Sequence, residues 1–288
     1  MRFSYAETFC DPSYLAPLAQ AAEAAGYDSF VVPDSLIFPA ESDTRYPYTV
    51  DGDRAFLEDK PIIEPFTLIP FLAATTTRIR FTTFVLKFAI RQVVLVAKQA
   101  ASIAVLSNDR LRLGVGISPW PEDFAAMDVP WEARGRRMDE MLDVLRGLTA
   151  GGWFEYHGEH VNLERCKITP VPDTPIPLLV GGHANVALRR AARAGDGWIH
   201  AGGDPAELGE MIKRVHALRA ESERANEPFE IHAISLEAFD LDGVRRLEDV
   251  GVTDVILGFR DMYGKQEQSL AEKLDLLRMY ADRVIAHA

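Results

Sequence analysis

The sequence has 288 residues, of which 48% are hydrophobic and 26% are charged, and its formal net charge is -12. These proportions are typical of a soluble globular protein and exclude a disordered or fibrous chain. The acidic balance argues against nucleic acid as a partner, because binding to a phosphate backbone uses clustered Lys and Arg. The two cysteines, Cys10 and Cys166, lack the spacing of a disulfide framework or a thiolate zinc site.

The first residues and the hydropathy pattern indicate where in the cell the protein is expected. The start of the sequence lacks the basic and apolar regions of a signal peptide. No apolar stretch approaches the roughly 18 residues that a membrane helix needs. We therefore expect a cytoplasmic protein without a membrane partner.

Short apolar runs alternate with helical patterns along the chain. A first helix is expected over residues 12–26, with Gly26 as its C-cap. Near-continuous apolar strands that are separated by helices predict a parallel sheet covered by helices. Eight strand–helix units predict an α/β fold, the (β/α)8 TIM barrel, and an open doubly wound sheet is the alternative. The eight predicted strands are residues 2–8, 29–34, 79–86, 111–116, 177–182, 197–202, 229–234 and 254–259.

Two segments are longer than ordinary connections, residues 35–60 and residues 150–176. Long loops in compact domains are usually functional, and barrel active sites form where the strands end. We interpret the chain as one domain, residues 1–288, with a long loop at 35–60 and an insertion within 150–176.

Two neighbouring predicted strands end in paired glycines, Gly181-Gly182 and Gly202-Gly203. Glycine lets backbone N–H groups approach a ligand closely, and the start of the following helix favours an anion. The two pairs together predict a phosphate-binding site at the strand ends. The alternative for either pair alone is a tight turn between strand and helix.

Acid/base candidates also lie at predicted strand ends. Asp34 and Glu7 end the second and first strands, where a carboxylate can bind a ligand or transfer a proton. For Asp34 the alternative is a turn or helix cap. His200 is the acid/base candidate among the histidines, which show no metal-ligand spacing, so no metal site is predicted. The sequence has no GxSxG nucleophile motif.

Three stretches resemble the luciferase-like monooxygenase superfamily, especially its branch of oxidoreductases that use the deazaflavin coenzyme F420. They are AEAAGYDSFVVPDS, the run from VVLVAKQAASIAVLSNDRLRLGVGISPW to RGRRMDEML, and PLLVGGHANVALRRAARAGDGW. The resemblance implies a bacterial luciferase-like TIM barrel with an insertion, and a flavin or deazaflavin ring across the strand ends. Dimers are common in this family, so a homodimer is expected.

The resemblance also implies which residues bind the cofactor. The ring would rest on a bulge in the third strand, often with a non-prolyl cis peptide, which maps onto residues 82–85, and Asp34 would lie near the polar edge of the ring. The remaining implied contacts come from three strand ends: Thr83, Phe84 and Val85; Gly116, Ile117 and Ser118; and Gly181, Gly182, His183, Gly202 and Gly203.

The sequence departs from the family at two positions. Ser35 stands where many members that use F420 have a histidine, and Ser118-Pro119-Trp120 stands where the sugar-phosphate dehydrogenases have a glutamate. The sugar-phosphate activity is therefore not implied, and the proton donor is unassigned among Glu7, Lys87 and His200. Trp120 and the aromatic residues of the insertion, Trp153, Phe154 and Tyr156, are alternatively core residues or the walls of a substrate pocket.

The leading hypothesis is an oxidoreductase that moves a hydride between F420 and an unidentified small organic substrate, with the protein supplying orientation and electrostatics. One alternative is an FMN-dependent luciferase-like monooxygenase. A second is a non-redox ligand-binding barrel, which Ser35 suggests.

Overall fold

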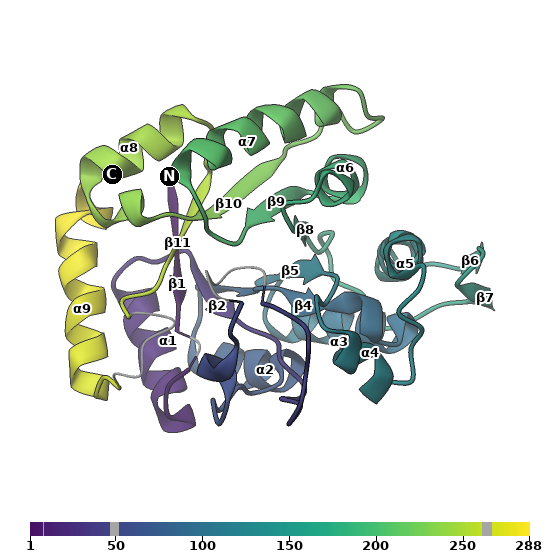
Figure 1. The fold of residues 1–288 in the computed structure, drawn as a ribbon, viewed down its shortest axis with the longest axis horizontal. Helices are drawn as coiled ribbons and strands as arrows, with labels where there is room; N and C mark the ends of the chain where they lie inside the picture. Colours follow the sequence, from purple (N-terminus) through teal and green to yellow (C-terminus); the bar gives the residue numbers. More distant parts are fainter. Residues whose placement is uncertain (8, 47–51, 261–266) are drawn as a thin grey trace.

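A computed structural model describes residues 1–7, 9–46, 52–260 and 267–288. Eight parallel strands close into a barrel, because β1 pairs with both β2 and β11, and β3 pairs with β5 (Figure 1). This confirms the predicted (β/α)8 fold. The barrel strands are β1 (Arg2–Ala6), β2 (Ser29–Val32), β3 (Arg80–Thr83), β5 (Leu111–Gly116), β8 (Leu178–Gly181), β9 (Gly197–His200), β10 (Glu230–Ile234) and β11 (Asp254–Leu257).

Several strands stop earlier than the sequence pattern indicates. β1 ends at Ala6, β2 at Val32 and β9 at His200, each two residues before the predicted end. The chain leaves the ladder there and turns toward the next helix. Asp34 and Gly202 therefore lie in the loops beyond the carboxyl ends of the strands, a region that we call the mouth.

Helices surround the barrel (Figure 1). The sequence pattern predicts no helix at α2. This helix is apolar on nearly all sides and holds Pro70, so it lacks the polar face that marks a helix. The sequence pattern also missed α9, although Ser269 and Glu272 form a capping box there. The helices are α1 (Leu15–Ala24), α2 (Pro65–Thr75), α3 (Val93–Leu106), α4 (Pro121–Ala126), α5 (Arg134–Thr149), α6 (Asn185–Ala194), α7 (Pro205–Ala220), α8 (Leu241–Asp249) and α9 (Leu270–Arg283).

The insertion forms a hairpin in place of the expected loop. β6 (Phe154–His157) and β7 (Asn162–Cys166) pair antiparallel and project beyond α5 (Figure 1). Glu140 of α5 holds the turn by accepting the backbone N–H groups of residues 159–161 at 2.8–2.9 Å. Phe154 lies against Gly147 of α5, and Trp153 is 62% exposed. Phe154 thus packs on α5, whereas the exposed ring of Trp153 lies beside Arg165 and Lys167. The alternative that these aromatic residues wall a substrate pocket stays a prediction.

The barrel interior is a layer of branched apolar side chains. Val31, Leu179, Ile199 and Ile256 come from four strands and are at most 2% exposed. Half-buried Ala6, Phe84, Val85 and Ile234 pack against this layer. Ala6 ends β1 and Ile234 ends β10, and Phe84 and Val85 follow β3. Together these four residues form an apolar floor to the mouth.

Within the described part of the chain, no helix is long and apolar enough to cross a membrane.

Candidate functional site

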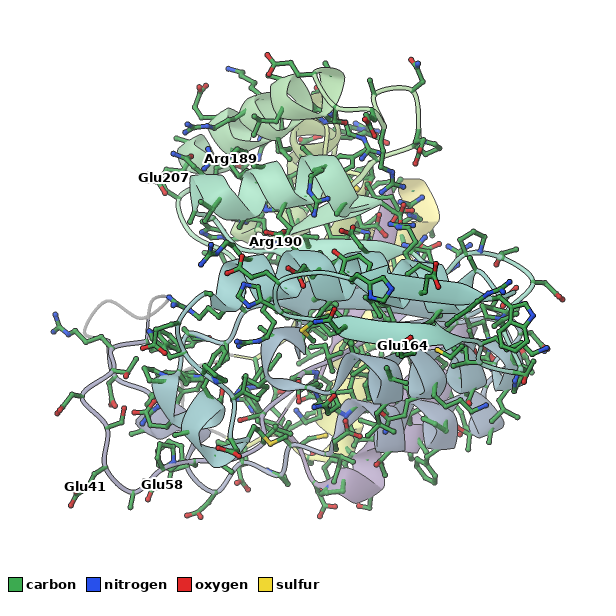
Figure 2. The ribbon with its side chains drawn as sticks, turned by 90° about the vertical axis from the view of Figure 1, so that its right-hand side faces the viewer. Glu41, Glu58, Glu164, Arg189, Arg190 and Glu207 are labelled. Atoms are coloured by element: carbon green, nitrogen blue, oxygen red, sulfur yellow. The ribbon has the colours of Figure 1, made fainter. Side chains whose placement is uncertain are left out.

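The mouth lies between the long segment 35–60 and the first turns of α6 and α7. Figure 2 shows Glu41 and Glu58 of the long segment on the same side of the molecule as Arg189 of α6 and Glu207 of α7. This is the end of a barrel where active sites form, because the loops that follow all eight strands converge there.

The third strand is interrupted at the floor of the mouth. β3 ends at Thr83, and the short strand β4 (Leu86–Lys87) resumes the pairing with β5. The peptide bond between Phe84 and Val85 is cis. The structure thus has the bulge and the non-prolyl cis peptide at the residues to which the resemblance mapped them.

Two glycines make room for Val85. A Cβ atom on Gly116 would lie 2.7 Å from Cγ2 of Val85, and one on Gly181 would lie 3.0 Å from Cγ1. Any larger residue at these two positions would therefore push against the bulge. Gly116 and Gly181 thus have a packing role beneath the floor, and their contact with a ring stays a prediction.

Gly114 and Thr83 have a structural role. A Cβ on Gly114 would lie 1.9 Å from the carbonyl oxygen of Thr83, and the Thr83 hydroxyl donates to the carbonyl of Gly114 at 2.7 Å. Close packing of β3 against β5 thus accounts for the glycine at position 114. Because its hydroxyl is occupied and buried, the side chain of Thr83 is not offered to a ligand.

The paired glycines border the floor on the side of β8 and β9. Gly182, Gly202 and Gly203 have φ values of +121°, +96° and +128°, which L side chains rarely adopt. A Cβ on Gly203 would meet no atom within 4 Å. Backbone conformation and open space together leave these loops exposed to a ligand, as an anion-binding site requires. We call Gly181, Gly182, Gly202 and Gly203 the glycine cradle.

His183 and His200 stack directly beside the glycine cradle. Their ring centroids lie 4.5 Å apart with an interplanar angle of 11°. Nε2 of His183 accepts the N–H of Ala201 at 3.1 Å, and Nδ1 of His200 accepts the N–H of Gly202 at 3.3 Å. The indole N–H of Trp198 donates to the carbonyl of Gly182 at 2.8 Å. The bonds of Trp198 and His183 tie the two glycine-rich loops together, and the bond of His200 fixes the loop after β9 against its own strand.

Burial keeps the two imidazoles neutral at neutral pH. Burial, helped by His183, lowers the pKa of His200 to about 4, against a smaller opposing effect of the Ile234 backbone. Burial also lowers the pKa of His183, and the carboxylate of Glu207 opposes that shift. A neutral ring whose Nδ1 is already occupied is a poor proton donor at this position. The geometry therefore favours a structural role for His200 over the acid/base role that we predicted.

Asp34 lies on the opposite border of the floor. Its Oδ1 accepts from Nη2 of Arg91 at 2.9 Å, and its Oδ2 accepts from the backbone N–H of Lys87 at 2.8 Å. Arg91 also reaches Glu64 at 3.0 Å. Asp34 therefore does not act as the helix or turn cap that was its alternative role, and its carboxylate holds the segment that follows the bulge.

A second buried ion pair lies beside this segment. Nζ of Lys87 is 2.7 Å from Oδ2 of Asp123 on α4, and both residues are less than 10% exposed. Ser118 donates its hydroxyl to the same oxygen and accepts the N–H of Trp120 at 3.1 Å. The hydroxyl of Ser118 is therefore used within the protein.

Glu7 pairs with the C-terminal helix. Nζ of Lys273 on α9 lies 2.8 Å from Oε2 of Glu7, and the hydroxyl of Tyr5 donates to the same oxygen at 3.4 Å. Glu7 is 3% exposed and Lys273 is 4% exposed. This pair fastens α9 to the end of β1, so its charge already has a partner.

The long segment packs onto Trp120 at the edge of the mouth. The guanidinium of Arg54 lies 4.4 Å from the centre of the Trp120 ring, and the ring of Tyr46 stacks on it at 5.6 Å. A pocket of about 10 Å³, room for roughly one water molecule, lies among Ser35, Phe38, Arg54 and Trp120. Trp120 thus joins the long segment to the barrel.

An ionic cluster closes the amino end of the barrel. Glu230, His232 and Asp254 bring three possible metal-donor atoms within 4.8 Å of one another. Arg2 lies 2.6 Å from Asp254, and Arg112 lies 3.0 Å from Glu230. Because two guanidinium groups already neutralise the carboxylates, a cation would have to displace them. We interpret the cluster as an ion-pair network.

The arrangement fits a flat, largely apolar ring with an anionic end. The half-buried floor at Phe84 and Val85 offers apolar contact, and the glycine cradle offers backbone at the border. Asp34 and Lys87 place polar groups along the other border. The sequence does not predict the His183–His200 stack or three ion pairs, because no local pattern reports contacts between distant strands. The pairs are Asp34–Arg91, Lys87–Asp123 and Glu7–Lys273. The binding roles of the predicted residues stay predictions.

Comparisons with known proteins agree with this fold. The luciferase-like monooxygenase family matches residues 3–241. The chain therefore belongs to that family.

Two related proteins are similar to this chain, and only the second has an activity in its name. An uncharacterised protein of Mycobacterium tuberculosis is 57% identical over 99% of both chains. An F420-dependent glucose-6-phosphate dehydrogenase of Gordonia bronchialis is 32% identical, over 78% of this chain and 63% of that protein.

Two solved structures share the fold. The coenzyme F420 dependent tetrahydromethanopterin reductase from Methanopyrus kandleri has a TM-score of 0.75 and 15% identity over 99% of both chains. A riboflavin lyase, solved with modified FMN and riboflavin, has a TM-score of 0.68 and 17% identity over 87% of this chain and 66% of that one.

Proposed function

We propose that the protein is an oxidoreductase that transfers a hydride between coenzyme F420 and a small organic substrate. The observation that carries the proposal is the position of the apolar floor at Phe84 and Val85 directly beside the glycine cradle. A flat ring with a phosphate-bearing tail needs both features in one mouth. The 32% identical F420-dependent relative supports the choice of cofactor.

The residues of the chain would bind and orient the cofactor. Phe84 and Val85 would carry one face of the ring, and Gly182 and Gly203 would approach the phosphate with their backbone. When bound, F420 would supply a ring carbon, in place of the flavin N5, that gives or takes a hydride with its two electrons.

The polar border would orient the substrate and the ring edge. Asp34 already accepts two N–H donors, so it serves to position the Lys87 backbone rather than to carry a proton. The Lys87 ammonium, held by Asp123, is the charged group of this border that could hold the proton that balances hydride transfer. Glu7, which is paired with Lys273, is a weaker candidate for that role.

An FMN-dependent monooxygenase is the second candidate. The family description and the likeness to a structure that holds modified FMN favour it. The floor and the glycine cradle would serve either ring, because the two cofactors share a flat tricyclic ring and a phosphate. A cytoplasmic location and a homodimer remain expectations from the sequence.

A titration of the purified protein with F420 and with FMN separates these candidates, with tryptophan fluorescence as the readout. Tight F420 binding with weak FMN binding would support the proposal and direct the search toward reducible substrates. The reverse result would make oxygen consumption the next assay. Binding of neither ring would contradict both candidates and favour a non-redox barrel.

A further inference from the structure

We propose that His183 and His200 are positioning residues, whose stacked imidazoles hold the Ala201–Gly203 backbone in the shape that receives the phosphate of the cofactor. This inference rests on the proposed function, since it assigns a role at the same site. It differs from an acid/base role for His200 and from a cationic phosphate ligand at His183.

The hydrogen bonds require both rings to act as acceptors. Ala201 donates its N–H to Nε2 of His183, and Gly202 donates its N–H to Nδ1 of His200. An imidazolium has no acceptor nitrogen, so each bond exists only while its ring is neutral. His183 is therefore protonated on Nδ1 and His200 on Nε2, as neutral tautomers.

The stack itself also opposes a positive charge. Two imidazolium rings at 4.5 Å and nearly parallel would repel, and His200 is only 1% exposed to solvent that could screen them. The carboxylate of Glu207 raises the pKa of His183, but the lowering by burial is larger, and the ring of Trp198 beside the stack carries no charge. The surroundings thus keep the pair uncharged at neutral pH.

The backbone N–H groups of residues 201–203 show which donor the two histidines leave for a ligand. The rings occupy the N–H groups of Ala201 and Gly202, so these two donors face the protein. The next N–H, that of Gly203, has no partner among the described residues, and the space beside its Cα is open. The two histidines thus leave one donor of the loop for a ligand, two residues before the start of α7, where an anion is favoured.

Two kinds of variant at His183 and His200 test this role, one that keeps a flat ring and one that keeps a hydrogen-bond acceptor. His183→Phe and His200→Phe keep the stack and remove the acceptors. His183→Gln places an oxygen where Nε2 lies, and His200→Asn places one where Nδ1 lies, and neither residue can carry a positive charge. His216→Phe, on the exposed face of α7, is the matched control.

The first readout is affinity for ligands with and without the phosphate, namely F420 and FMN against the phosphate-free deazaflavin and riboflavin. Each Phe variant should weaken binding of the phosphate-bearing ligand about tenfold, the effect of one lost hydrogen bond. Binding of the phosphate-free ring should change less than about twofold. The Gln and Asn variants should recover most of the loss. Equal losses for both ligands, or no recovery, would overturn the inference.

The second readout is amide hydrogen exchange of the ligand-free protein. His183→Phe should speed exchange at Ala201 and His200→Phe at Gly202, with recovery in the Gln and Asn variants. Unchanged exchange in the Phe variants would contradict the inference that the two histidines hold this loop. If the wild type bound neither ring, the proposed function would fail, and the exchange experiment would still decide whether the histidines hold this loop.

Discussion

Asp34 and Arg91 join the ends of two neighbouring barrel strands through a buried ion pair. Oδ1 of Asp34 accepts from Nη2 of Arg91 at 2.9 Å, with side chains 0% and 12% exposed. The other carboxylate oxygen accepts the N–H of Lys87, the residue that ends β4. A single carboxylate thus anchors the segment that follows the floor of the mouth.

Replacing this carboxylate should destabilise the protein strongly. Asp34→Ala leaves the Lys87 N–H and one face of Arg91 without a partner, so the free energy of unfolding should fall by about 3 kcal/mol. Asp34→Asn should cost less, because its amide oxygen can still accept the N–H of Lys87. Urea denaturation measures both changes.

Glu64→Gln is the control for this pair. It removes the charge of the half-exposed partner of Arg91, 3.0 Å away, while its amide oxygen can still accept the N–H of Thr67 at the start of α2, so it should cost at most about 1 kcal/mol. Equal effects of Asp34→Ala and Glu64→Gln would show that the buried bonds to Asp34 carry no special weight.

A charge in the glycine cradle should block an anionic ligand. Gly182 has a φ of +121°, and its Cβ would lie 3.0 Å from Cβ of Ala187. Gly182→Asp should weaken F420 or FMN binding at least about tenfold and lower the free energy of unfolding by about 1–3 kcal/mol. Gly209→Asp adds the same charge on α7, where a Cβ meets no atom within 4 Å, and should leave affinity unchanged. Normal affinity in Gly182→Asp would remove the phosphate assignment.

Stability should fall on acidification through His200. Its folded-state pKa is about 4 and its ordinary value is 6.5, so between these values the unfolded chain binds a proton that the folded chain does not. The contribution is complete above pH 6.5 and decreases as the pH falls, by up to about 1.4 kcal/mol per unit. Between pH 7.0 and 5.5, His200→Phe should lose about 1 kcal/mol less than the wild type in urea denaturation. Identical pH dependence in the two proteins would contradict the neutral, buried imidazole.

The expected homodimer has a suitable surface on two neighbouring helices. Phe71 of α2 and Leu95 of α3 are 55% and 57% exposed, and the helices pack side by side (Figure 1). Exposed apolar patches of this kind commonly bury themselves in protein interfaces. Light scattering should find a dimer for the wild type and a monomer for Leu95→Glu. Leu236→Glu, at an 84% exposed position, should stay dimeric. A monomeric wild type would rule the dimer out.

Local patterns were sufficient for the barrel but not for its exceptions. The strand at residues 111–116 was predicted with its observed bounds, because an apolar run between a turn and a glycine is unambiguous. The helix α2 was missed, because a helix that is apolar on nearly all sides carries no 3.6-residue signal. The sequence pattern predicts a loop where the hairpin at 154–166 forms. Its two short, half-exposed strands stabilise each other only after they pair.

The sequence by itself determined the eight strands, the glycine pairs and the acidic residue that follows β2, because propensity, spacing and backbone freedom are properties of adjacent residues. Only the tertiary structure decided which of these groups are free to act. Glu7 meets Lys273 across 266 positions of sequence, and His183 meets His200 only because β8 and β9 pair in one register. Barrel closure sets those distances, and the partner that a charge or a ring nitrogen finds there determines whether it can bind a ligand or only hold the protein together.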